Sequence, residues 1–343
     1  MPGRYAEAHK RENYNGPGDA RPTGLQIIQD EGRRGDLLDK VVVITGCSSG
    51  IGISTAVAMA ATGATVYCTA RDLDKATGAL GDLVEKSRKV HLLHADLTSL
   101  ASIKALADDI KKREAKVNIL INNAGVMYVP EKVNTEDGFE LQIGTNHFAH
   151  FFLFCQLRDH LLAGSTADFN SRVINVSSMG HRASPVLLDD INLGKSYDPF
   201  IGYSQSKTAN IHMANHLDRL YGSRGIHAYS LSPGGIVTDL QKHVKDMLND
   251  ALKDDKFSTF LKSVDQGCAT TVWAAVAQEL EGKGGLYLED CTIAEKAAED
   301  LDEAGDGRVE PGYAKWAYDP EREKALWKLS LGMVGMPADF DNV

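Results

Sequence analysis

The sequence lacks any apolar run that approaches the roughly 20 residues needed to cross a bilayer. Its most apolar stretches, FFLFC at 151–155 and the alanine-rich segment after Gly52, are too short or too mixed. Residues 1–24 are polar and contain no apolar core of the kind that a signal peptide requires. These absences argue against a transmembrane segment and lead us to expect a soluble, cytoplasmic protein.

Cysteine and clustered positive charge are also scarce. The five cysteines show no CxxC spacing and lie mostly inside apolar stretches, so we expect reduced core residues. A formal net charge of -10 argues against a nucleic-acid surface, because binding to phosphates needs clustered cations. The cysteines are Cys47, Cys68, Cys155, Cys268 and Cys291.

Short β-branched runs alternate with longer amphipathic stretches from residue 40 onward. The runs predict buried strands, and the stretches between them predict helices. Apolar strands that alternate with helices are typical of a parallel sheet covered on both sides. The sequence therefore predicts an α/β fold, a single doubly wound Rossmann-type domain with a parallel sheet flanked by helices on both faces. The predicted strands are 40–46, 64–70, 89–96, 117–125, 172–178 and 226–235, and the predicted helices include 52–63, 73–88 and one that begins after Thr98 and Ser99.

The predicted catalytic domain covers residues 39–343 and follows an N-terminal arm at 1–38. Glycine, proline and charged residues suggest that this arm is extended or flexible. Three further ranges depart from the regular alternation: an insert at 179–202, a segment at 238–262 and a C-terminal extension at 286–343. Specificity in such folds usually lies in loops after the strand ends, so we expect departures of this kind to shape a substrate site.

The segment 238–262 has two interpretations. Its intermittent apolar residues fit a mobile lid over a lipophilic substrate, and they fit equally well an amphipathic helix pair packed on the sheet. The C-terminal extension contains an acidic stretch, AEKAAEDLDEAGDG at 294–307, before a predicted final helix, PEREKALWKLSLGM at 320–333.

A glycine-rich turn, TGCSSGIG at 45–52, connects the first predicted strand to the first predicted helix. It contains Gly46, Gly50 and Gly52. Glycines allow the backbone to approach a pyrophosphate closely, and a helix N-terminus offers unpaired N–H groups and a positive dipole end. The strand–turn–helix context predicts a dinucleotide site.

The spacing of this turn, together with five later motifs in order, resembles the short-chain dehydrogenase/reductase family. The insert before GYSQSKTANI, together with GGLYLEDC and YDPEREKALWKLS, is most similar to its retinol-dehydrogenase-like branch. The later motifs are NNAG at 122–125, Asn146 in GTNHFAHF, NVSS at 175–178, YSQSK at 203–207 and SPGGIVT at 232–238.

The resemblance implies a nicotinamide dinucleotide cofactor. NAD-preferring relatives carry an acidic residue at the end of the second strand, where this sequence has Ala70 followed by Arg71. An arginine can hold a 2'-phosphate, so NADP(H) is favoured, with NAD(H) possible. Two observations weigh against this: Asp72 could simply neutralise a solvated Arg71, and Ser49 stands where many NADP-binding relatives have a basic residue.

The remaining cofactor contacts are also implied by resemblance. Asp96 is expected to hold the adenine with Leu97 beside it, although Asp96 could equally cap the following helix. Ile236 and Thr238 are expected near the carboxamide, in a segment that is also a turn after a strand. The full implied set is Gly46, Ser48, Ser49, Gly50, Ile51, Gly52, Arg71, Asp96, Leu97, Asn123, Ala124, Gly125, Tyr203, Lys207, Pro233, Gly234, Ile236 and Thr238.

Four residues are implied to be catalytic. Tyr203 would be the acid/base, and Lys207, four residues later on the same helix face, would lower the Tyr203 pKa and bind the nicotinamide ribose. Ser178 would polarise the substrate oxygen, and Asn146 would hold a water in a proton relay from Lys207. Alternatively, Ser177 and Ser178 are turn residues and Asn146 is a buried polar group.

The resulting hypothesis is an NADP(H)-dependent oxidoreductase that acts on a hydrophobic carbonyl or alcohol. A same-fold epimerase or dehydratase and a non-catalytic NADP-binding regulatory protein are the alternatives. Family likeness also suggests a homodimer or homotetramer, although the C-terminal region could cover the helices involved. We predict no metal site, because His147 and His150 lack a third ligand, and we expect that Cys291 could line the substrate pocket.

Overall fold

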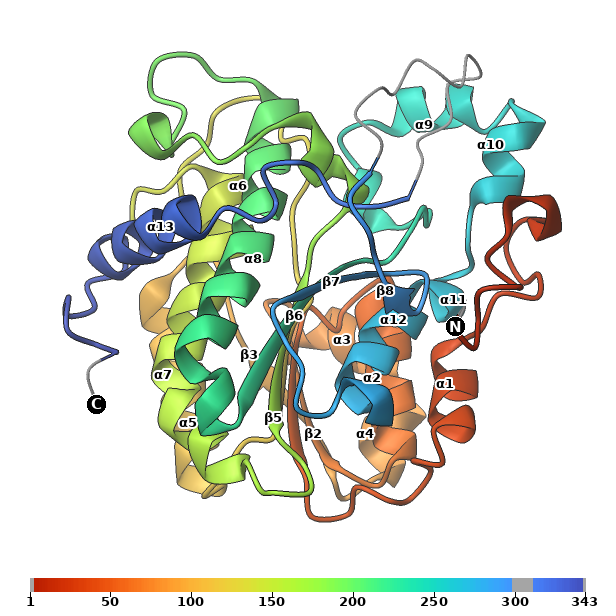
Figure 1. Cartoon of the computed structure of the whole chain (residues 1–343), viewed down its shortest axis with the longest axis horizontal. Helices are drawn as coiled ribbons and strands as arrows, with labels where there is room; N and C mark the ends of the chain where they lie inside the picture. The colour runs from red at the N-terminus through yellow and green to blue at the C-terminus, as the bar shows by residue number, and fades with distance from the viewer. Residues whose placement is uncertain (1–2, 298–310, 342–343) are drawn as a thin grey trace.

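One mixed sheet forms the centre of the molecule, in the strand order β3-β2-β1-β4-β5-β6-β7-β8 (Figure 1). The computed structural model describes residues 3–297 and 311–341. The first seven strands are parallel and β8 is antiparallel to β7, so the predicted doubly wound fold is confirmed. The strands are β1 (Val41–Thr45), β2 (Thr65–Ala70), β3 (Val90–His94), β4 (Ile119–Asn122), β5 (Ser171–Val176), β6 (Ile226–Ser232), β7 (Leu286–Glu289) and β8 (Thr292–Ile293).

Alternating side chains of the central strands are buried on opposite faces of the sheet. In β1, Val41 and Val43 join one hydrophobic cluster, whereas Val42 and Ile44 join the other. All five β1 residues are buried, which explains why the strand has an unbroken apolar run and no polar face.

Helices cover both faces of this sheet (Figure 1). Residues of α5, α7, α8 and α13 belong to the first cluster, and residues of α1, α2 and α12 belong to the second. In the described part of the chain, no helix is both long and apolar enough to cross a membrane. The helices are α1 (Gly24–Asp30), α2 (Ile51–Ala61), α3 (Leu73–Leu80), α4 (Asp82–Lys86), α5 (Leu100–Arg113), α6 (Leu141–Ile143), α7 (Ala149–Gly164), α8 (Pro199–Tyr221), α9 (Lys245–Ala251), α10 (Asp255–Phe260), α11 (Val264–Gly267), α12 (Ala269–Val276) and α13 (Pro320–Met333).

The N-terminal arm is neither extended nor loosely attached, so the expectation from its composition was wrong. It contains α1, whose N-terminus is capped by the Thr23 side chain, which accepts a hydrogen bond from the Gln26 amide. Ile27 and Ile28 of this helix are buried in the cluster formed with α2 and α12. Apolar packing by a seven-residue helix outweighs the turn-forming composition around it.

One predicted helix is two. The range 73–88 divides into α3 and α4 at Gly81, whose φ of 40° lies in the left-handed region. Glycine reaches this region without the steric penalty of a Cβ, so it ends α3 and starts α4 in a new direction.

The C-terminal extension completes both the sheet and one helical layer. It adds β7 and β8, which the sequence did not predict, and it ends in α13, which coincides with the predicted final helix. Trp327 of α13 packs edge-on against Phe151 and Phe154 of α7. The helix thus covers α7 and packs along α8, the helix that carries YSQSK. Most of the acidic stretch at 294–307 lies outside the described residues.

We predict that Trp327→Ala destabilises the protein by about 3–5 kcal/mol, because it empties a buried site. The Trp327 side chain is 3 % exposed, and its Nε1 donates to Asp341 Oδ2 at 2.8 Å. Denaturant unfolding would measure the loss, and Trp327→Phe, which retains an aromatic ring, should lose clearly less. Equal stability of the alanine variant and the wild type would contradict this packing.

Candidate active site

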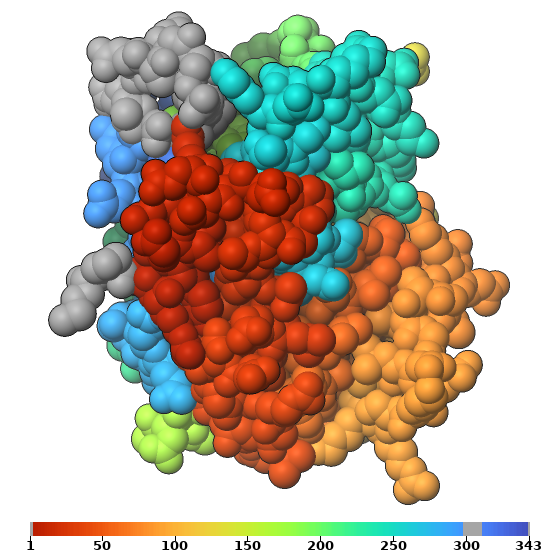
Figure 2. Space-filling model, turned by 90° about the vertical axis from the view of Figure 1, so that its right-hand side faces the viewer, coloured from red at the N-terminus to blue at the C-terminus, as the bar shows by residue number. Residues whose placement is uncertain are grey.

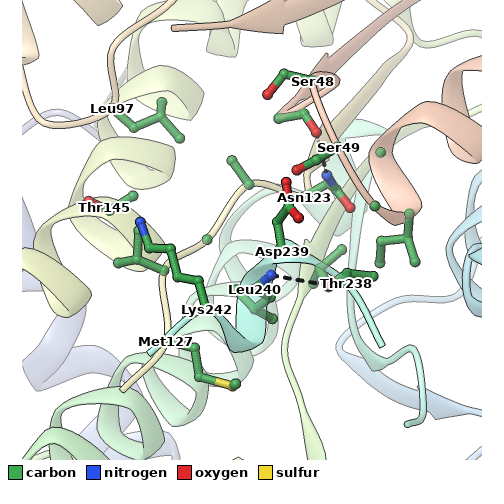
Figure 3. Close-up of a pocket in the computed structure, with 18 of the residues that line it drawn as sticks. Ser48, Ser49, Leu97, Asn123, Met127, Thr145, Thr238, Asp239, Leu240 and Lys242 are labelled. Carbon is green, nitrogen blue, oxygen red and sulfur yellow. Dashed lines mark hydrogen bonds between the residues drawn. The ribbon is translucent and has the colours of Figure 1, made fainter. Parts of the chain in front are cut away.

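A cleft of about 650 Å³ opens at the carboxyl ends of the parallel strands. It is lined by segments that follow β1 to β6 and lies where the strand order reverses between β1 and β4, the place where doubly wound sheets bind ligands. Figure 3 shows Ser48 and Ser49 toward one end and Met127 toward the other. Every residue of the predicted cofactor set lines this cleft, as does Ser178, but Asn146 does not.

The glycine turn after β1 has the geometry of a phosphate cradle. Gly46 and Gly50 have φ angles of 79° and 60°, and a Cβ on Gly52 would lie 2.2 Å from the Gly46 carbonyl oxygen. Gly50 precedes α2 and offers no side-chain cap, so the helix start faces the cleft with backbone N–H groups. These features fit a dinucleotide pyrophosphate.

The residues that follow β4 hold the last residue of β1, from which the turn begins. Asn123 Nδ2 donates to the Thr45 carbonyl at 2.8 Å, and the backbone amides of Asn123 and Ala124 donate to Thr45 Oγ1. His150 also bonds to Thr45 Oγ1, at 2.8 Å, which gives this histidine a structural role in the core. His147 bonds instead to Ser330 Oγ of α13.

The end of β2 presents an exposed cation to the cleft. Arg71 forms no ion pair within the described residues, and Asp72 accepts a hydrogen bond from the Lys75 amide as the N-cap of α3. Asp72 is therefore occupied by the helix rather than by Arg71. Lys75, which the sequence did not single out, also lines the cleft and forms an ion pair with Asp239 at 2.7 Å.

Asp96 does not cap α5, whose N-cap is Ser99, and its predicted contact with the adenine stays a prediction. Its Oδ1 accepts hydrogen bonds from Thr98 N at 2.9 Å and Thr98 Oγ1 at 2.8 Å, a local turn before α5. Asp96 and Leu97 nevertheless line the cleft, so the turn leaves them available to a ligand.

Tyr203 and Lys207 meet on the buried side of α8. Both side chains are nearly inaccessible, at 4 % and 3 % exposed, and Lys207 Nζ lies 5.6 Å from the centre of the Tyr203 ring. Burial lowers the pKa of Lys207 to about 8 and raises the pKa of Tyr203 above its usual value. Within the protein alone, therefore, Lys207 does not bring the Tyr203 pKa toward neutrality.

The two serines after β5 have different surroundings. Ser177 Oγ donates to the Lys207 carbonyl at 2.7 Å, which joins the strand end to α8. Ser178 Oγ accepts from the Gly180 amide at 3.0 Å, and its hydrogen bond to Tyr203 lowers the Tyr203 pKa, against the larger effect of burial. Ser178 is thus the serine that lies beside the Tyr203 hydroxyl.

Asn146 lies in a π-helical turn, Gly144–Phe148, between α6 and α7. Its Nδ2 donates to Val126 O and Ser206 Oγ, and its Oδ1 accepts from Val126 N at 2.8 Å. The side chain matches the buried, satisfied polar group that was the alternative interpretation. The amide anchors the loop after NNAG, π-turns are frequent at functional sites, and the role of Asn146 in a proton relay from Lys207 stays a prediction.

Several residues near the cleft were missed by the sequence analysis. Tyr128 has a φ of 52°, unusual for an aromatic residue, and its ring lies 5.1 Å from that of Tyr203 and 4.4 Å from that of Phe200. No sequence signal marks a positive φ at a tyrosine. Leu240 and Lys242 of the segment 238–262 line the cleft as well (Figure 3).

Cys291 was expected to line the pocket, and this was wrong. It is 2 % exposed and lies outside the cleft, and its backbone N–H donates to Thr270 Oγ1 at 3.2 Å. The five cysteines are all free and buried, as expected.

Comparisons with known proteins agree on one family. The family model for short chain dehydrogenases matches residues 40–249. The short-chain dehydrogenase/reductase prx1 of Penicillium roqueforti is 46% identical over 335 residues, covering 97% of this chain and 96% of the relative. The polyprenol dehydrogenase of Homo sapiens is 34% identical, covering 87% and 86%, and retinol dehydrogenase 11 of Homo sapiens is 33% identical, covering 88% and 87%.

Solved structures share the fold. An uncharacterised protein from Mycobacterium paratuberculosis has a TM-score of 0.63 and 31% identity, covering 87% of this chain and 94% of that one. The NADPH-bound carbonyl reductase from chicken fatty liver has a TM-score of 0.55 and 24% identity, covering 73% and 96%.

We predict that Lys207→Met stabilises the ligand-free protein at pH 7 by about 1–3 kcal/mol, because a buried ammonium is costly and methionine has a similar shape. The folded pKa of about 8 lies below the ordinary lysine pKa of 10.5, so the unfolded chain binds more protons between these values. The stability of the wild type relative to the variant should therefore rise from pH 8 to pH 10.5. Chemical unfolding of both proteins across this range checks the prediction, and a difference that does not vary with pH would refute it.

Proposed function

Because the chain belongs to the short-chain dehydrogenase/reductase family, in its retinol-dehydrogenase-like branch, it is an oxidoreductase, and we propose that it transfers hydride between NADP(H) and a hydrophobic carbonyl or alcohol. The observation that carries this proposal is a single cleft with the Gly46–Gly52 turn at one end and Tyr203, Lys207 and Ser178 at the other. The names of two relatives, a polyprenol dehydrogenase and a retinol dehydrogenase, favour a lipophilic substrate.

Tyr203 Oη is the proton donor in carbonyl reduction and the acceptor in the reverse reaction. NADP(H), when bound, supplies or accepts the hydride. Burial favours the neutral phenol, which suits a group that must hold its proton until the substrate oxygen gains charge. The Ser178 hydroxyl donates a hydrogen bond to that oxygen and so polarises the carbonyl.

Lys207 stabilises the phenolate that remains after proton transfer. Its ammonium lies near the Tyr203 ring in a buried region, where the attraction between opposite charges is stronger than in water. A surface pair worth about 0–1 kcal/mol could not supply the stabilisation required. The burial that is unfavourable in the resting protein is therefore useful during the reaction.

Arg71 supports the preference for NADP(H) over NAD(H). Ala70, at the end of β2, replaces the carboxylate that would repel a 2'-phosphate, and the exposed guanidinium of Arg71 lines the same part of the cleft. A guanidinium can bind a phosphate through two parallel hydrogen bonds.

Tyr203→Phe removes only the hydroxyl that carries the proton, and we expect kcat to fall by about a hundredfold or more. The variant keeps the ring that contacts Tyr128, so the melting temperature should remain close to that of the wild type. The assay follows nicotinamide absorbance with a panel of lipophilic ketones, aldehydes and alcohols. Full activity of this variant would overturn the proposed mechanism.

Arg71→Ala should raise the KM for NADPH about tenfold, because a charge-assisted contact is lost, and should leave the KM for NADH nearly unchanged. Parallel KM measurements with the two nucleotides give the comparison. Arg88→Ala serves as the control, since Arg88 is exposed and lies outside the cleft. An equal change for both nucleotides would mean that Arg71 does not recognise the 2'-phosphate.

A further inference from the structure

The N-terminal arm lies outside the range 40–249 that matches the family, and the proposed function assigns it no role. Figure 2 nevertheless shows the arm, in red, directly against the segment 238–262, in cyan. We call this segment, residues 238–262, the candidate lid. The contact is specific at the backbone, because Gly16 N donates to Thr259 O at 3.0 Å.

Arg21 is the centre of this contact. It is 2 % exposed, and its guanidinium donates to the carbonyl oxygens of Phe260 at 2.8 Å and Leu261 at 2.6 Å. These carbonyls lie at the C-terminal end of α10, where carbonyl oxygens have no backbone N–H donor from the same helix. Asp19 forms an ion pair with Arg21 at 2.8 Å and so neutralises the buried charge.

The arm is itself fixed from the opposite side. Gln266 of α11 donates through Nε2 to the carbonyl oxygens of Asp19 and Arg21 and accepts through Oε1 from Gly18 N. The Tyr14 ring covers the guanidinium of Arg21 at 4.4 Å. Arg21 is thus held rigidly before it meets the candidate lid.

Phe260 and Leu261, which Arg21 binds, are followed by Lys262, which contacts the wall of the cleft. Lys262 N donates to Gly235 O at 2.8 Å, and Lys262 pairs with Ile236 in a parallel bridge. A Cβ on Gly235 would lie 2.8 Å from the Phe260 ring, so the two segments are closely packed. Gly235 and Ile236 line the cleft, in the turn expected to meet the nicotinamide end.

Between its two ends the candidate lid has little support. Neither α9 nor α10 contributes a buried residue, which contradicts the interpretation as a helix pair packed on the sheet. At the first end, Thr238 and Gln241 form a reciprocal capping box, and Gln241 Nε2 donates to Ile236 O at 2.7 Å. At the second end, Arg21 binds the Phe260 and Leu261 carbonyls beside the Gly16–Thr259 backbone hydrogen bond.

We infer that Arg21 is a positioning residue through which the N-terminal arm anchors the second end of the candidate lid and, through Lys262, the cleft wall at 235–236. The anchoring itself does not depend on the proposed function, whereas its kinetic consequence does. The arm therefore helps to position the cleft wall, in addition to covering one face of the sheet.

The test compares amide hydrogen exchange in the full chain, without added nucleotide, for the wild type and Arg21→Lys. Lysine keeps the charge that Asp19 neutralises, but it cannot bond several oxygens from one rigid plane. We expect exchange in residues 239–262 to accelerate about tenfold, with β1 and α12 unchanged. In turnover assays, KM for the carbonyl substrate should rise several-fold while kcat stays within about twofold, a split that a general loss of stability does not produce.

Two further variants make the result decisive. Arg33→Ala removes another arginine of the arm, one whose Nε donates at 3.3 Å to the carbonyl of Val276, the last residue of α12, and it should leave exchange in 239–262 unchanged. Tyr14→Ala leaves the Arg21–Asp19 pair intact and removes the ring that lies over Arg21 and beside Phe260, so it should give the same local acceleration at smaller amplitude, even if Arg21→Lys fails to fold. Unchanged exchange in 239–262 for Tyr14→Ala and Arg21→Lys, or equal acceleration in Arg33→Ala, overturns the inference. A wild type without turnover would count against the proposed function only, because the exchange result is independent of it.

Discussion

The buried ammonium of Lys207 is the constraint on which the rest of the cleft depends. No carboxylate pairs with it in the described part of the chain, and Nζ donates to Val176 O at 3.0 Å. The end of β5 must therefore stay in register with α8. Asn210 Nδ2 donates to the same carbonyl, Ser177 Oγ donates to the Lys207 carbonyl, and Asn175 Nδ2 donates to the Asn210 carbonyl, so several hydrogen bonds join the strand end to the helix. Ser178 and Tyr203 are positioned as a consequence of this joint.

The fold was predictable from the sequence where the local sequence pattern and the tertiary packing favour the same residue types at the same positions. β1 is apolar because both of its faces are buried, and α13 begins at Asp319 and Pro320, an N-cap and a first-turn proline that the sequence displays openly. β7 was missed because it has only four residues after a glycine pair, too few to show a period. α1 was missed because seven residues surrounded by turn-forming ones are helical only when packed against α2 and α12.

The site was predictable in its members and not in its contacts. Motifs placed the glycine turn, Ser178, Tyr203 and Lys207 in one cleft, since strand ends of a parallel sheet converge. The hydrogen bonds of the Asn146 side chain are made with Val126 and Ser206. The Arg21 guanidinium binds carbonyl oxygens about 240 positions later in the chain. Contacts between residues so far apart in the chain produce no periodic pattern in the sequence, and no residue type near Tyr128 indicates its positive φ.

The two faces of the sheet are completed at different times when the chain is made. The face covered by α1, α2 and α12 receives its first helix from residues 24–30, whereas Phe151 and Phe154 on the other face wait for Trp327. Synthesis proceeds from the N-terminus, so these aromatic side chains leave the ribosome well before their cover. A nascent chain that ends before residue 320 therefore lacks the Trp327 ring that covers Phe151 and Phe154 in the folded protein.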